Sequence, residues 1–176
     1  MRHIVVALAI LLLGIGVAGC GPIVKVAEGT TAGHREDQLF DHATHVAIVP
    51  VDSVNERINS PDNQYWGQDS AVYREAQVTV ERVLKGESPR VILQTGGEVG
   101  NFRHLNQGQR YLELGKTYLL FLAEWQAPEK DGSTHAISPV GALEQVAFTE
   151  VEPGVWASLD GAYTLTEDEL DKASTD

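Results

Sequence analysis

The feature that most constrains this fold is the alternation of apolar and polar residues between Tyr73 and Leu84. Successive side chains of an extended strand point to opposite faces, so Ala76 and Val78 share one face and the polar residues between them share the other. Residues 85–89 then read Lys-Gly-Glu-Ser-Pro. Glycine accepts positive φ and proline interrupts a ladder, so this stretch predicts a turn, and the apolar residues 91–93 predict a returning strand. We therefore expect a β-hairpin at the centre of a small β-domain.

Further short apolar runs predict more strands around this hairpin. Residues 46–51 predict the first strand, in which Pro50 indicates a bulge or an edge position. Residues 117–122 form the most apolar run after the N-terminal segment and predict a buried central strand, with an internal helix as the alternative. Residues 147–157 predict a second hairpin that turns at Pro153-Gly154. The predicted fold is mainly β: a small OB-like Greek-key barrel of about five strands plus a C-terminal hairpin, with short helices at most.

The N-terminus has the pattern of an export signal. Arg2 and His3 form a basic start, and residues 4–17 are apolar except for two glycines. Small residues follow this run, as they do before a signal cleavage site. The run is shorter than the ~20 residues that a membrane-spanning helix needs. We expect residues 1–19 to be a signal peptide that is removed.

Residues 17–20, Val-Ala-Gly-Cys, resemble the lipobox of bacterial lipoproteins. The resemblance implies that Cys20 is lipidated and becomes the first residue of the mature chain. Cys20 is the only cysteine, so the modified chain has no thiol left for a disulfide, a thiolate metal site or a nucleophile. The alternatives are an ordinary secretory signal with an incidental cysteine, or a plain anchor helix. A lipid on Cys20 would attach the protein to the cell membrane or the outer membrane, facing the extracytoplasmic space.

The rest of the chain divides into three predicted parts. Residues 20–37 are mostly small or polar, and we expect a lipidated cysteine and a tether there, although the apolar residues 23, 24 and 26 could instead lie at the membrane interface. Residues 38–161 form the β-domain, which a short helical turn at 38–43 would open. Residues 162–176 form an acidic tail, in which Thr166 and Glu169 could cap a last short helix or leave a frayed end.

Composition excludes some functions. The formal net charge of −12 repels phosphate backbones, so nucleic acid is not an expected partner. The sequence contains no Gly-x-Ser-x-Gly, His-Glu-x-x-His or phosphate-loop motif. We therefore expect no enzyme activity and no cofactor.

The order of these elements is similar to that of a known family. Residues 78–87 (VTVERVLKGE), residues 95–97 (TGG) and residues 114–122 (LGKTYLLFL) occur in sequence after the first strand. Over about residues 44–158 the chain resembles bacterial exported domains related to the netrin-like and tissue-inhibitor-of-metalloproteinase OB-fold. The resemblance implies a five-stranded Greek-key barrel with extra hairpins. Those inhibitors use a free N-terminal cysteine held by disulfides, and a lipidated Cys20 has no such role, so inhibition is not transferred.

Histidines and acids are concentrated just before the first strand. His34, His42 and His45 lie within twelve positions, together with Asp37 and Asp41. On a helix Asp41 and His45 would share a face, which suits a zinc ligand pair. A strand that begins near His45 would separate these side chains, leaving a polar lead-in to that strand. Metal binding through the three histidines is therefore an alternative function.

Aromatic residues in loops give the main indication of binding. Tyr65 and Trp66 lie in a polar loop predicted at residues 55–70, and Trp125 lies where a strand enters the turn at 127–133. In an OB-type barrel these two loops flank one face. The rings could contact an envelope protein or a glycan, or they could cap the open end of the barrel. The function that we expect is a non-enzymatic, lipid-anchored envelope module that binds such a partner; inhibition of an extracytoplasmic protease is a further alternative.

Overall fold

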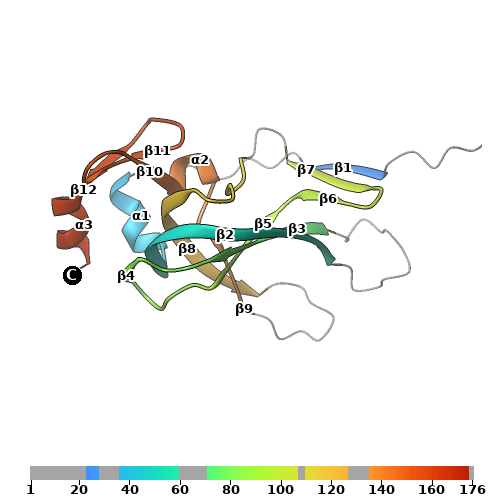
Figure 1. Cartoon of the computed structure of the whole chain (residues 1–176), viewed down its shortest axis with the longest axis horizontal. Coiled ribbons are helices and arrows are strands. Elements are labelled where there is room, and N and C mark those ends of the chain that lie inside the picture. The colour runs from blue at the N-terminus through green and yellow to red at the C-terminus, as the bar shows by residue number, and fades with distance from the viewer. Residues whose placement is uncertain (1–22, 28–35, 60–70, 107–109, 127–134, 175–176) are drawn as a thin grey trace, which may run out of the picture.

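A computed structural model describes residues 23–27, 36–59, 71–106, 110–126 and 135–174. These residues form twelve strands and three short helices (Figure 1). In chain order they are β1 (Ile23–Ala27), α1 (Glu36–His42), β2 (His45–Asn59), β3 (Ala71–Val78), β4 (Arg82–Lys85), β5 (Val91–Thr95), β6 (Gly97–Val99), β7 (Phe102–Asn106), β8 (Thr117–Gln126), β9 (His135–Pro139), α2 (Leu143–Val146), β10 (Ala147–Glu152), β11 (Val155–Ser158), β12 (Thr164–Thr166) and α3 (Glu167–Ala173). The prediction of a mainly β fold with short helices is confirmed.

Strand β2 organises the main sheet, in which the strand order is β12-β11-β10-β8-β2-β3-β5. The first part of β2 pairs antiparallel with β8, from His45↔Leu122 to Pro50↔Thr117. Its second part pairs antiparallel with β3, out to Asn59↔Ala71. The β2–β3 ladder begins at Val51↔Val78 and has a register shift between Val51 and Ser53, one residue after the proline that predicted a bulge. The first part of β2 also pairs antiparallel with β4, from Val46↔Lys85 to Ile48↔Arg82, so β2 has three neighbours.

The main sheet is curled. Strand β9 pairs with the outer edge of β8, so five consecutive neighbours run β9-β8-β2-β3-β5. The strands at the two ends of this run, β5 and β9, lie against each other. The described residues show no ladder of hydrogen bonds between them. The five-stranded OB-like barrel therefore remains a prediction, whereas the C-terminal hairpin β10–β11 is confirmed.

The two central strands are buried on both faces. Side chains of β2 and β8 alternate between two core clusters: Val46, Ile48, Leu119 and Phe121 belong to one, and Ala47, Val49, Leu120 and Leu122 belong to the other. Residues 118–122 are at most 1% exposed, which confirms the buried central strand predicted there. Full burial of one such aliphatic side chain contributes about 1.5–3 kcal/mol. These two strands thus contribute side chains to both core clusters.

The C-terminal segment belongs to the packed structure. Strand β12 pairs with β11, and Leu165 and Leu170 join the first core cluster. Thr166 caps α3 by accepting a hydrogen bond from the Glu169 backbone amide, while the Glu169 carboxylate accepts from the Thr166 backbone amide. This capping box is the one that the sequence indicated. Of the two expectations for residues 162–176, a helix rather than a frayed end is observed up to Ala173.

Two segments differ from the sequence-based expectation. Residues 55–59 lie in β2, so the loop predicted from Asn55 begins later, and residues 60–70 lie outside the described part. Ile23–Ala27, predicted as part of a tether, form β1, which pairs in parallel with β7 in a small sheet of order β1-β7-β6. The two differences have different reasons. Residues 55–59 are polar although they pair with the next strand, β3, whereas β1 pairs with a strand far away in sequence that local composition does not reveal.

The molecule is elongated (Figure 1). Helix α3 and the hairpin β10–β11 lie at one end of the long axis, and the small sheet lies at the other. The open ends of β2 and β3 point toward the end that carries the small sheet. This polarity places the site residues described next.

Candidate functional site

The predicted lipidation residue, Cys20, lies outside the described residues, but its distance from the fold in sequence is informative. Strand β1 begins at Ile23, so only Gly21 and Pro22 stand between the cysteine and a paired strand. Register pairs Ile23 with Phe102, the first residue of β7. The N-terminus of β1 therefore lies beside the turn that joins β6 to β7.

The predicted aromatic residues are only partly described. Tyr65 and Trp66 fall in residues 60–70, outside the described part. The backbone of Trp125 lies in β8, opposite Ala136 of β9. Asn59↔Ala71 and Gln126↔His135 are the last pairs of the two hairpins that carry these residues. The binding role of the three rings stays a prediction.

The histidines proposed as metal ligands do not form a cluster in the described residues. His42 is an exposed residue at the end of α1, and His34 lies outside the described part. His45 is 5% exposed; its Nδ1 lies 2.8 Å from Thr44 Oγ1 and its Nε2 lies 3.7 Å from a carboxylate oxygen of Glu124. The described residues hold no group of three or more histidine, cysteine or acidic side chains arranged for a metal ion. His45 is instead the first residue of β2, whereas His42 is the last residue of α1.

A polar cluster that the sequence analysis did not identify joins the two sheets. It consists of Glu56 on β2, Arg74 on β3, Glu98 on β6 and Tyr111, and we call it the Arg74 cluster. Arg74 Nη1 lies 3.6 Å from Glu56 Oε1, and its guanidinium carbon lies 5.1 Å from the centroid of the Tyr111 ring. The second carboxylate oxygen of Glu56 accepts a 2.9 Å hydrogen bond from the Glu98 backbone amide. One carboxylate thus bridges the hairpin β2–β3 and the small sheet.

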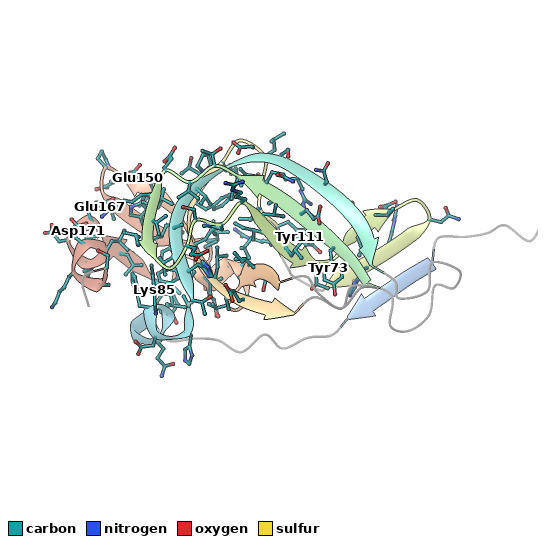
Figure 2. All side chains as sticks on the ribbon, turned by 90° about the horizontal axis from the view of Figure 1, so that it is seen from below. Tyr73, Lys85, Tyr111, Glu150, Glu167 and Asp171 are labelled. Atoms are coloured by element: carbon teal, nitrogen blue, oxygen red, sulfur yellow. The ribbon has the colours of Figure 1, made fainter. Side chains whose placement is uncertain are left out.

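The environment of the Arg74 cluster is half-buried. The Arg74 and Glu56 side chains are 25% and 30% exposed, and burial raises the pKa of Tyr111, against the opposing effect of Arg74. Arg74 Nε is buried without a hydrogen-bond partner among the described residues. A cation stacked on an aromatic ring and paired with one carboxylate is typically a fixed structural contact. The cluster therefore positions the small sheet on the main sheet; Figure 2 labels its member Tyr111 and, close by, Tyr73.

Two glycines make this close contact possible. Gly96 and Gly97 have φ values of +119° and +122°, which side chains other than hydrogen rarely permit. A Cβ on Gly96 would lie 2.0 Å from the Tyr111 hydroxyl, and one on Gly97 would lie 3.0 Å from the Glu56 carboxyl carbon. The Gly-Gly pair, which the sequence marks as a bend after the second hairpin strand, lets β5 turn directly into β6. This glycine pair was the one local signal of the junction.

A second polar cluster lies at the opposite end, where Figure 2 labels Glu167 and Asp171. Arg82 on β4 donates to the carboxylates of both residues on α3. Glu167 also accepts a 3.2 Å hydrogen bond from the indole N–H of Trp156, which is 4% exposed and belongs to the core. The bond from Arg82 holds the pKa of Glu167 below its ordinary value. This arrangement, the C-terminal clasp, fastens α3 to the main sheet.

Comparison with known proteins gives no relative on which to base a function. No family model matches the chain, and no curated protein matches it significantly. Among the described residues, none of the helices has both the length and the apolar character to cross a membrane. The class that the fold defines is a mainly β domain with a curled main sheet and a small accessory sheet.

Proposed function

We propose that this protein is an exported, lipid-anchored module that binds a protein or glycan of the cell envelope and performs no chemistry of its own. The observation that carries the proposal is the position of the only cysteine. It follows an apolar segment and three small or branched residues, Val17-Ala18-Gly19, at the place where lipid attachment requires a thiol. Its proximity to β1 also supports the proposal, because an anchor there would hold a folded domain at a membrane surface.

The polar clusters support a binding role rather than a catalytic one. Arg74 and Arg82, the two cations at the centres of these clusters, are each paired with carboxylates that join separate elements of the fold. Side chains committed in this way hold the scaffold in place. Recognition then falls to the open ends of the two hairpins, where Tyr65 and Trp66 follow β2 in the chain and Trp125 is the second-to-last residue of β8. Large amphipathic rings at the end of a rigid sheet are favourable contact residues.

The lipid anchor is tested first. Cells that produce the wild-type chain or the Cys20→Ser variant are grown with labelled palmitate, and intact mass is measured on the membrane-extracted protein. We expect label and an acyl mass increment on the wild type only. Label that persists on the Cys20→Ser chain would place the lipid elsewhere and refute this part of the proposal.

The binding surface is tested by capture from native envelopes with the chain from residue 21 onward, which lacks the cysteine and keeps β1. We expect Trp66→Ala and Trp125→Ala each to abolish capture and to leave the thermal midpoint nearly unchanged. Trp156→Phe is the matched control, because this indole is a core residue: it should lower the midpoint and retain capture. If the first two variants unfold like a core variant, the rings are part of the packing and the proposed surface is wrong.

A further inference from the structure

The short distance between Cys20 and β1 limits where an anchored domain can lie. Consecutive Cα atoms are 3.8 Å apart, so the three steps from Cys20 to Ile23 span at most about 11 Å. A flexible tether of about 16 residues, as expected from composition, would average ~20–25 Å and leave the orientation free. Because Ile23 is instead fixed to Phe102 by strand pairing, the lipid and the small sheet are held close together.

Strand direction then decides which part of the small sheet is nearest to the lipid. β1 and β7 run in parallel, so the start of β1 lies at the start of β7. The antiparallel hairpin β6–β7 turns at Gly100-Asn101, immediately before Phe102, and both turn residues are exposed. The start of β1, three residues after the cysteine in the chain, and this turn are therefore at the same end of the small sheet, which lies at one end of the long axis in Figure 1.

The Arg74 cluster fixes the orientation of the small sheet relative to the main sheet. Glu56 holds the β6 backbone at Glu98, and Gly97 packs closely on Val72 and Glu56. Contacts of β6 with both β2 and β3 add to these bonds. Because the small sheet is held in this way, the main sheet keeps one orientation relative to the small sheet.

The small sheet and α3, at opposite ends of the molecule, also differ in charge. The strands of the small sheet carry Lys25, Arg103 and one acid, Glu98, whose carboxylate is paired with Arg103. Helix α3, at the opposite end, carries four acids and one lysine. A bilayer that contains anionic lipids repels carboxylates within about a Debye length, ~8–10 Å. The end nearest to Cys20 is thus the end that such a surface repels less.

We propose that the β6–β7 turn rests on the phospholipid surface and that α3 points away from it. The proposal deepens the lipid-anchored function and depends on it. It assigns the small sheet as the surface that contacts head groups. The domain consequently presents its acidic C-terminal end to the extracytoplasmic space.

The orientation is tested with single-cysteine labelling. Acylated Cys20 no longer reacts with a thiol dye, so Asn101→Cys in the turn and Asp168→Cys on α3 each introduce one reactive thiol at an exposed position. The acylated full-length variants are labelled with a fluorophore and inserted into phosphatidylcholine–phosphatidylglycerol vesicles that contain a short-range head-group quencher. We expect the dye at position 101 to lose most of its emission and the dye at 168 to keep it. Equal quenching at the two positions, or stronger quenching at 168, would overturn the proposal.

A spacer provides the matched control. Ten Gly/Ser residues inserted between Gly21 and Pro22 add a flexible segment with an average reach of ~17–19 Å. This insertion should relieve most of the quenching at 101, and undiminished quenching would show that the short connection does not set the orientation. Failure of the anchor itself is distinguishable, because a non-acylated chain would take up a second dye on Cys20 and would lack the acyl mass.

Discussion

Substitution of Leu170 tests whether the acidic C-terminal helix is an integral part of the fold. Leu170 is the buried residue of α3, with 0% exposure, and belongs to the first core cluster. Leu170→Ala removes three carbon atoms, which at ~0.8 kcal/mol each is about 2.4 kcal/mol of lost burial. A residual cavity raises the cost, and Leu→Ala changes in cores typically destabilise by 2–5 kcal/mol. Because a short terminal helix can partly collapse into the space, we expect about 2–3 kcal/mol.

The assay is equilibrium urea unfolding of the soluble domain, followed by far-ultraviolet circular dichroism. In a thermal scan of the same domain, the midpoint temperature should fall by about 5–10 °C, at about 2–4 °C per kcal/mol for a domain of this size. Leu114→Ala is the control, because Leu114 is 66% exposed and its truncation should change stability by no more than ~0.5 kcal/mol. If the two variants are equally stable, α3 does not dock on the sheet in solution and the packing described here is wrong.

Three other predictions concern the polar clusters. The pKa of Glu167 is lowered in the folded state, chiefly by the hydrogen bond from Arg82. The stability that this carboxylate contributes is therefore present above its ordinary pKa and is lost as pH falls through the folded value. Unfolding midpoints measured from pH 7 to 3 should decline less steeply in Glu167→Gln. Gly97→Ala should destabilise by about 2–3 kcal/mol and Gly100→Ala by about 1 kcal/mol. Both glycines have a positive φ, but of these two only Gly97 has close neighbours for an added Cβ; equal effects would contradict this. Glu56→Ala should cost about 1–2 kcal/mol and accelerate hydrogen exchange at the Glu98 backbone amide of β6, which donates a hydrogen bond to the Glu56 carboxylate. Unchanged exchange would show that this carboxylate does not hold β6.

Local patterns predicted the elements whose partners are near in sequence. The alternation before Leu84 corresponds to β3 and β4, and the run at 117–122 corresponds to β8. The predicted return strand is β5, which pairs antiparallel with β3. The predicted turn at 85–89 does not join these two strands directly, because β4 pairs with β2 and the β3–β5 ladder starts at Gln77↔Val91. Even here the alternation breaks at residues 79–81, where Thr79 and Glu81 donate backbone hydrogen bonds to Pro50 and Ile48 of β2. The break reflects the partner strand and not the composition of these residues. The hairpin at Pro153-Gly154 and the capping box at Thr166 are likewise local, and the structure has both.

Elements with a polar composition or with distant partners were not predictable. The outer part of β2 is largely polar because its hairpin with β3 extends beyond the core, so residues 55–59 have the composition of a loop. Strand β1 is stabilised by parallel pairing with a strand about eighty residues later. Strands β4 to β7 separate Arg74 from Tyr111 in the chain, and the two side chains meet only in the folded structure. Long-range pairing of this kind leaves no periodicity in a single sequence.

The physical roles of the two kinds of contact are different, and this difference bears on how the protein works. Each fully buried apolar side chain of the two core clusters contributes about 1.5–3 kcal/mol, whereas each partly exposed ion pair contributes roughly 0–1 kcal/mol. The ion pairs instead fix where the outlying pieces sit: the Arg74 cluster fixes the small sheet and the C-terminal clasp fixes α3. A domain that must stand in one orientation on a lipid anchor needs rigid attachment of the piece nearest to the anchor. Neutralising the Arg74 cluster should therefore disturb orientation at the membrane more than it disturbs the unfolding midpoint.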